Sequence, residues 1–296
     1  IHPLGLASPA LRALPLAEHG LRWVHPDVPL AHPLDDGRAA VLRRDVTETA
    51  DGLGGDARAY RRLLGPWVRA GTDLTDGLLA PLTVPPRHPV VLARFGPLGI
   101  RSARGLARGR FETEEARALF AGLAAHSILQ LTAPGTAGYG LMLGVLGHLV
   151  GWPMAEGGSQ RIADALVAEL EARGGSVTCD RRIASLDELP PADATVLDLT
   201  PRQVVALAGD RLPARYRRSL ERFRYGPGVH KVDWTLDGPI PWTNEHVAGA
   251  ATVHVGGPLD EIVHAEAEVW KGRVAERPFV LLAQQTPFDP TRAPPG

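Results

Sequence analysis

The sequence has a single cysteine, Cys179, and almost no excess of charge of either sign. One cysteine cannot close a disulfide within the chain, which is typical of a reducing compartment, so we expect a cytoplasmic protein. We interpret Cys179 as a packing residue of a strand. The formal net charge is -1. Nucleic-acid-binding proteins concentrate Lys and Arg to neutralise phosphates, and this balance therefore gives no support to a nucleic-acid partner.

Several motifs that carry chemistry are also missing. The chain has no Gly-x-Ser-x-Gly, no His-Glu-x-x-His, no Walker loop and no paired cysteines. These absences leave esterase-type hydrolysis, a zinc site and P-loop chemistry unsupported. A Gly-x-Gly-x-x-Gly turn after a first strand is absent too, since Gly138 and Gly140 fall within an apolar helix. We interpret His246, His254 and His264 as scattered surface or core histidines, because their spacings fit no common metal-ligand pattern.

Of the 296 residues, 44% are hydrophobic and 22% charged, which is ordinary for a soluble globular protein of one or two domains. Apolar residues at helical spacing predict helices along the chain. A cap at Thr113 followed by acidic residues supports one of them, Ser159 is a plausible cap of another, and Gly174 is placed to end it. The expected helices cover residues 56–70, 112–130, 137–152, 159–173 and 258–271.

Other apolar runs predict strands. In the longest, His230, Val232, Trp234 and Leu236 alternate with more polar residues, which predicts one buried face. An Asp36-Gly37 turn between apolar runs predicts a hairpin. The expected strands cover residues 176–179, 193–199, 226–240 and 278–283. Together with the preceding helix, the first two indicate part of an α/β layer.

The run 137–152 is almost wholly apolar, with glycines four apart at Gly140 and Gly144 and again at Gly147 and Gly151. Such spacing lets two helices approach closely. The run is shorter than the roughly 20 residues of a membrane span and contains His148. A buried helix is the first interpretation, and a helix that contacts a membrane surface is the alternative.

The order and spacing of several short motifs resemble phytoene-desaturase-like enzymes of the amine-oxidase fold group, over nearly the whole chain. The motifs are His2-Pro3-Leu4, Gly151-Trp152-Pro153, Gly157-Gly158-Ser159-Gln160, Gly174-Gly175, Arg182-Ile183, Val196-Leu197-Asp198-Leu199-Thr200-Pro201, Tyr225-Gly226-Pro227-Gly228, Lys231-Val232-Asp233-Trp234, and Phe288-Asp289-Pro290. The resemblance implies an α/β protein with an α+β substrate domain. In it, a partial Rossmann-type FAD-binding layer joins a substrate domain built of an antiparallel sheet and helices.

The resemblance also implies where a flavin would lie. The segment matching Arg182 and Ile183 would pass the adenine of FAD, and the strand end matching Thr200 and Pro201 would lie near the dinucleotide. Gly157 and Gly158 would let the backbone approach the flavin-side cavity closely. The alternative for these two glycines is that they only begin a helix. We expect no metal.

By the same resemblance, residues 1–155 are mainly substrate domain, 156–205 return to the FAD-binding domain, and 206–296 complete the substrate-domain sheet. The family's dinucleotide fingerprint would lie before Ile1, and a further flavin-contacting segment after Gly296. We therefore expect the chain by itself to be an inactive fragment of an FAD-dependent oxidoreductase.

In that enzyme, hydride would pass between the substrate and flavin N5. Apolar helices at 116–130 and 137–152 could line a tunnel for a polyisoprenoid or lipid-like substrate. No catalytic acid or base stands out, since His126 and His148 are expected to be satisfied buried histidines. Two alternatives stay open: a non-catalytic binding module on the same fold, and a module in peripheral contact with a membrane. The sequence does not indicate an oligomeric state.

Overall fold

A computed structural model of the chain describes residues 1–81 and 83–293. Its contacts divide the chain into two compact units. Unit 1 comprises Ile1–Gly174 and His230–Gly296, and unit 2 comprises Gly175–Val229. This division follows contacts alone, so the three-part functional division expected from the sequence stays a prediction.

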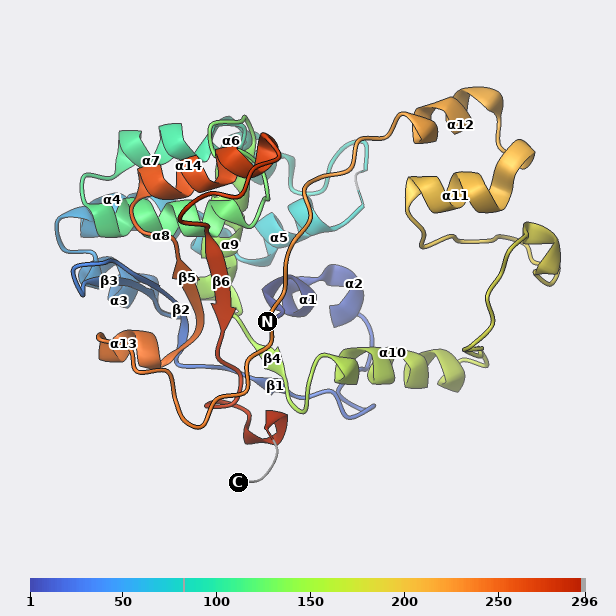
Figure 1. Ribbon diagram of the computed structural model, residues 1–296, viewed down its shortest axis with the longest axis horizontal. Helices are drawn as coiled ribbons and strands as arrows, with labels where there is room; N and C mark the ends of the chain where they lie inside the picture. The colour runs from blue at the N-terminus through green and yellow to red at the C-terminus, as the bar shows by residue number, and fades with distance from the viewer. Residues whose placement is uncertain (82, 294–296) are drawn as a thin grey trace. The chain divides into compact units, whose positions relative to one another are not determined.

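Unit 1 contains the sheets and most of the helices (Figure 1). Its strands are β1 (Trp23–Val24), β2 (Val28–Pro33), β3 (Ala39–Leu42), β4 (Met154–Ala155), β5 (Ala250–Val255) and β6 (Val280–Ala283). Its helices are α1 (Pro3–Ala7), α2 (Pro9–Arg12), α3 (Val46–Gly52), α4 (Ala57–Ala70), α5 (Thr72–Leu79), α6 (Pro89–Gly99), α7 (Ala103–Arg110), α8 (Glu114–Ala125), α9 (Thr136–Leu149), α10 (Gln160–Ala172), α13 (Glu245–Ala248) and α14 (Leu259–Trp270), with short 3₁₀ turns at Gly54–Asp56 and Pro290–Arg292.

The main sheet is mixed. Within the described residues it has the strand order β3-β2-β5-β6, and β1 pairs separately with β4. The β2–β3 hairpin forms as the Asp36-Gly37 turn predicts, with Gly37 at a φ of 85° that favours glycine. β2 and β5 run parallel, whereas the sequence led us to expect an antiparallel sheet. The fold is therefore mixed α/β, with one parallel pair at the centre of the sheet.

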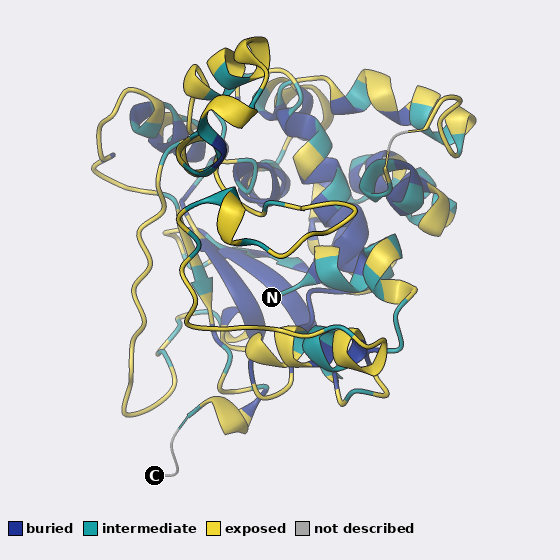
Figure 2. Cartoon of the chain, turned by 90° about the vertical axis from the view of Figure 1, so that its right-hand side faces the viewer, coloured by how far each residue is buried: buried dark blue, intermediate teal, exposed yellow. Residues whose placement is uncertain are grey.

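Each face of this sheet packs against helices because apolar side chains alternate along its strands. Leu30 and its neighbours on one face join the core formed by the long helices. Ala31 and Val253 on the other face pack with Val247 of α13. Figure 2 shows the central strands almost wholly buried. β6 is an edge strand and is largely exposed.

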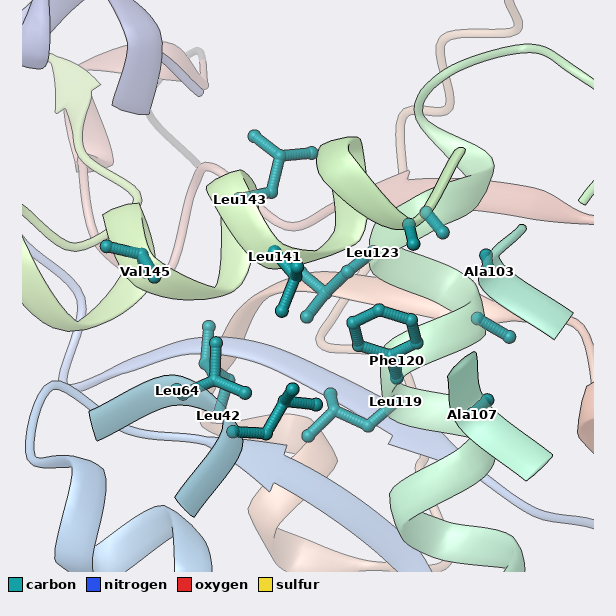
Figure 3. Packing of buried hydrophobic residues seen from close by; sticks show 14 of the residues in the cluster. Leu42, Leu64, Ala103, Ala107, Leu119, Phe120, Leu123, Leu141, Leu143 and Val145 are labelled. Carbon is teal, nitrogen blue, oxygen red and sulfur yellow. The ribbon is translucent and has the colours of Figure 1, made fainter. Parts of the chain in front are cut away.

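Helices α8 and α9 form the centre of the core. Thr113 caps α8 by accepting a hydrogen bond from the Ala116 amide, as predicted. Phe120 and Leu123 of α8 pack with Leu141 of α9 (Figure 3). The sequence prediction of a buried helix at 137–152 is confirmed by α9.

The glycines of α9 are used for this packing. A side chain at Gly140 would press on Phe120, one at Gly144 on Leu64, and one at Gly147 on Leu42. The glycine-spaced surface thus faces the interior of unit 1, where it brings helices and sheet close together. No helix in the described part of the chain is long and apolar enough to cross a membrane.

The remaining helix predictions agree with the structure. The expected helices at 56–70, 159–173 and 258–271 correspond to α4, α10 and α14, and the last expected strand corresponds to β6. Gly174 ends α10 at a φ of 83°, as predicted. The predicted cap of α10 is wrong in its detail, because the Ser159 hydroxyl hydrogen-bonds to His2 Nε2 (2.9 Å) and makes no cap bond.

Unit 2 is made of short helices and irregular chain. Its elements are α11 (Pro201–Ala208), α12 (Ala214–Glu221) and 3₁₀ turns at Leu186–Glu188 and Gly209–Arg211.

The strands predicted at 176–179, 193–199 and 226–240 are wrong: the structure has no strand at these residues, and Cys179 is exposed rather than packed. Val196 is 92% exposed and Trp234 is 79% exposed, so the predicted buried faces do not form either. Strands need partners, and alternation alone does not supply them.

Candidate functional site

The Gly157-Gly158 turn connects β4 to α10 in unit 1. Both glycines have positive φ, 74° and 114°, which side-chain-bearing residues rarely adopt. The Gly157 amide donates to Asp289 Oδ2 (2.8 Å), and the Gly158 amide donates to the Ala155 carbonyl (3.0 Å). The turn is therefore a tight backbone feature fixed by a buried carboxylate.

Two arginines flank this turn. A Cβ at Gly157 would lie 3.3 Å from Arg161 Nε, and one at Gly158 would lie 3.7 Å from the Arg292 guanidinium. The turn also leads into the N-terminus of the 13-residue helix α10, where the helix dipole favours anions. Burial lowers the pKa of His2, and the N-terminal amino group and Arg292 lower it further. The charge around the turn is mixed, because Arg161 pairs with Asp164 (3.5 Å) and Asp289 accepts from the Gly157 amide.

These features can be tested against the cofactor that the resemblance implies. A glycine surface without Cβ atoms, two guanidinium groups and a helix N-terminus are suited to close approach of a phosphate-bearing dinucleotide. The two glycine amides already donate to acceptors within the protein. The contacts to the cofactor would therefore come from the arginine side chains and from the glycine backbone, which has no Cβ atoms in the way. The residues at this turn are chemically compatible with FAD, and the sequence analysis did not single out Arg161 or Arg292.

The other predicted cofactor residues lie in unit 2. Arg182 is exposed and Ile183 half-buried, both in irregular chain. Thr200 precedes α11, where its amide and hydroxyl donate to Gln203 Oε1 (3.0 and 2.8 Å), and Pro201 begins the helix. The predicted strand end at Thr200 is therefore a helix start instead. Neither unit contains all six predicted residues, and their roles stay predictions.

A second constellation lies between the sheet and α8, and the sequence analysis did not find it. His32 of β2 and His254 of β5 are fully buried on the face that meets α8. Gly122 of α8 makes room for both rings, because a Cβ there would collide with His254 Nδ1 and approach His32 Nδ1 to 3.1 Å. The half-buried His126 completes the cluster, with its Nε2 2.9 Å from His254 Nε2.

These histidines are held neutral by their surroundings. Burial lowers the pKa of His32 and of His126 to about 4, and lowers that of His254 well below its usual range. His32 Nε2 donates to the Gly257 carbonyl (2.8 Å), so its Nδ1 carries a lone pair. Among the described residues, His32 Nδ1 and His254 Nδ1 have no hydrogen-bond partner. Two buried ring nitrogens are thus left unsatisfied at one place.

His148 behaves as the sequence analysis expects of a satisfied buried histidine. Its Nε2 accepts from the Tyr60 hydroxyl (2.8 Å), and its Nδ1 donates to the Arg44 carbonyl (3.2 Å). Burial raises the pKa of Tyr60 and lowers that of His148, so the pair is neutral. His246 and His264 are exposed, as expected of scattered histidines, whereas His254 belongs to the cluster.

A cavity of about 820 Å³ opens where β2 and β5 end, at the edge where ligands of open α/β sheets commonly bind. Trp242 and the Gly256-Gly257 backbone line it. Its arginines are engaged: Arg277 pairs with Asp35 (2.7 Å), and Arg38 pairs with Glu115 (2.5 Å). The sequence analysis missed this edge, although the Gly256-Gly257 pair directly after an apolar run could have indicated it.

No group of three or more His, Cys, Asp or Glu side chains in the described part of the chain is arranged to hold a metal ion. The described features are therefore a glycine turn flanked by two arginines, a buried histidine cluster and a cavity at the sheet edge. The chain matches no family model, and no curated protein or solved structure matches it.

Proposed function

We propose that the chain is part of an FAD-dependent oxidoreductase that transfers hydride between an apolar substrate and the flavin. The observation that carries this proposal is the Gly157-Gly158 turn, with its positive φ angles and its two flanking arginines. It lies at the motif that most resembles the flavin-side segment of phytoene-desaturase-like enzymes. The flavin would supply the redox chemistry, and the chain would supply position and charge.

An apolar substrate, polyisoprenoid or lipid-like, remains part of the proposal. It rests on the apolar character of α8 and α9. In the described structure these helices pack their large side chains against one another, so the expected tunnel has no direct support. The cavity at the ends of β2 and β5 is the alternative place for a small molecule, and it would also serve a non-catalytic binding module.

The proposal is tested by expressing the protein from its intact coding sequence and measuring bound flavin from the visible absorption spectrum. Flavin should copurify in about equimolar amount. Arg292→Gln and Arg161→Gln together should weaken flavin binding roughly tenfold or more, because each removes a charge-assisted contact. Arg62→Gln is the matched control, since it makes the same charge change at an exposed position of α4.

Flavin bound equally well by the double variant would remove the glycine turn from the cofactor site. Complete absence of flavin from the folded protein would contradict the oxidoreductase proposal itself, and would favour a binding module.

A further inference from the structure

The histidine cluster brings two unpartnered nitrogens to one buried point. His32 and His254 are neighbours on adjacent parallel strands and are 0% exposed. Both Nδ1 atoms lie against Gly122 of α8, the one residue type that leaves this space open. Buried polar atoms in folded proteins nearly always have a partner. Two such atoms converging on one spot indicate that a small ligand binds between them.

The tautomers decide what that ligand can be. His32 donates through Nε2 to Gly257, so its Nδ1 is a lone pair. His254 and His126 share one proton between their Nε2 atoms. When His254 supplies that proton, its Nδ1 is a lone pair as well. Two lone pairs facing one buried point repel each other unless an electrophile lies between them.

The rings of His32 and His254 are not hydrogen-bonded to each other. Their centroids are 6.2 Å apart, whereas those of the hydrogen-bonded His126 and His254 are 5.0 Å apart. An ion bound by two ring nitrogens, with metal–nitrogen bonds of about 2 Å each, would hold the nitrogens about 4 Å apart, and the wider ring spacing is compatible with such a bridge. The rings are also nearly perpendicular, at 82°, which keeps their edges from colliding around a shared ion.

We propose that His32 Nδ1 and His254 Nδ1 form a two-coordinate site for a soft monovalent cation of the Cu(I) type. Zinc requires about four ligands, and the described residues offer no such group. A d¹⁰ monovalent ion accepts two imidazoles in a line, and imidazole suits copper. A single charge also costs less to bury than a double one. The ring centroids of Phe279 and Trp152 lie 5.5 and 5.9 Å from that of His254, so two aromatic rings pack beside the site.

The test is an anaerobic titration with Cu(I) against a chromophoric chelator. The parent protein carries Cys179→Ser, because that exposed thiol would otherwise compete for the ion. We expect one Cu(I) per chain in the parent. His32→Gln and His254→Gln should each lower the affinity roughly 100-fold or more, since each removes one of only two ligands. His264→Gln, at an exposed position of α14, is the control and should leave the affinity unchanged.

A second measurement does not depend on how well the variants fold. Histidine-labelled parent protein is titrated with Ag(I), and the ring nitrogens are followed by NMR. Two Nδ1 signals should shift together at one equivalent of Ag(I). Unchanged Cu(I) affinity in a folded His32→Gln variant, or Ag(I) shifts confined to exposed histidines, would overturn the proposal. In that case a water molecule shared by the two nitrogens is the better occupant.

Discussion

At the scale of single residues, burial fixes the protonation state of the histidines between the sheet and its helices. His32, His254 and His126 gather around Gly122, and His148 pairs with Tyr60 nearby in the core. Each is more stable neutral than charged because the surrounding apolar atoms replace water. The acid sensitivity of the protein should therefore follow these few side chains.

The free energy of unfolding should fall as the pH drops from about 6.5 to about 4. Burial lowers the folded-state pKa of His32 and His126 to about 4, below the ordinary value of 6.5. The unfolded chain then binds more protons, so their stabilising effect is complete above pH 6.5 and is lost as the pH falls. The loss should amount to a few kcal/mol, and urea unfolding at a series of pH values measures it.

His126→Gln should reduce this slope, whereas His264→Gln, at an exposed position, should leave it as it is. Glu266, whose pKa burial raises to about 7, titrates in the same interval and changes the stability in the opposite direction, so every protein in the series carries Glu266→Gln. In that background, a free energy of unfolding that stays level between pH 6.5 and 4.5 would show that the cluster is not buried in solution.

The sequence could not reveal this cluster. His32, His126 and His254 are roughly a hundred positions apart, and no spacing rule joins residues from two strands and a helix. We interpreted His254 as one of several scattered histidines for this reason. A buried His148 was foreseeable, because it lies in an almost wholly apolar run, and a helix that is apolar all round is buried.

At the scale of elements, α8 and α9 pack closely at the centre of the core. Gly140 faces Phe120 and Ala124, where an added Cβ would lie 3.1 and 3.2 Å from the nearest carbons. Such distances are shorter than ordinary van der Waals contacts. Because protein interiors are packed as densely as organic crystals, the neighbouring side chains have little room to move away. The close approach of the two helices thus depends on a missing side chain.

Gly140→Ala should lower the free energy of unfolding by about 1–3 kcal/mol, because the new methyl group overpacks the interface. This loss should outweigh the gain in helix propensity that Ala normally brings. The matched control is Tyr139→Ala, the neighbouring position, where the side chain is 45% exposed and the change should stay within about 0.5 kcal/mol. A Gly140→Ala protein more stable than the parent would contradict this packing.

The five helices expected from the sequence form, although others such as α5, α6 and α7 were missed, whereas three of the four expected strands do not form. The period of apolar residues in α4 and α10 is local information, and each helix makes its own hydrogen bonds. A strand needs a second segment to pair with, and the alternation in 226–240 does not provide one. β5 forms because β2 and β6 lie on either side of it.

At the scale of the whole chain, backbone hydrogen bonding is distributed unevenly. Unit 1 contains the sheets and the longest helices, whereas residues 175–183 and 190–199 of unit 2, and residues 230–239 of unit 1, make no backbone–backbone hydrogen bonds with described residues. Exposed apolar side chains such as Val196 accompany these segments. Local stability should therefore be distributed very unevenly along the chain.

Hydrogen exchange should show this difference directly. Amides of residues 192–199 should exchange at nearly the rate of an unstructured peptide, because no backbone hydrogen bond protects them. Amides of α8 and α9 should exchange several orders of magnitude more slowly, because only opening of the core exposes them. Mass spectrometry of peptides from the exchanged protein provides both rates. Alternate protected residues within 193–199 would mean that this segment pairs as a strand after all.

The parallel pairing of β2 with β5 also means that the main sheet cannot be completed until late in synthesis. Leu30 lies opposite Thr252. One edge of β2 therefore has no partner strand until the ribosome has synthesised β5. At about 5–20 residues per second, that delay is on the order of 10–40 s. During it, the β2–β3 hairpin presents an open, apolar edge to every other nascent chain nearby. The yield of folded protein should therefore depend strongly on the supply of chaperones. This dependence should be stronger than the stability of the folded protein alone would predict.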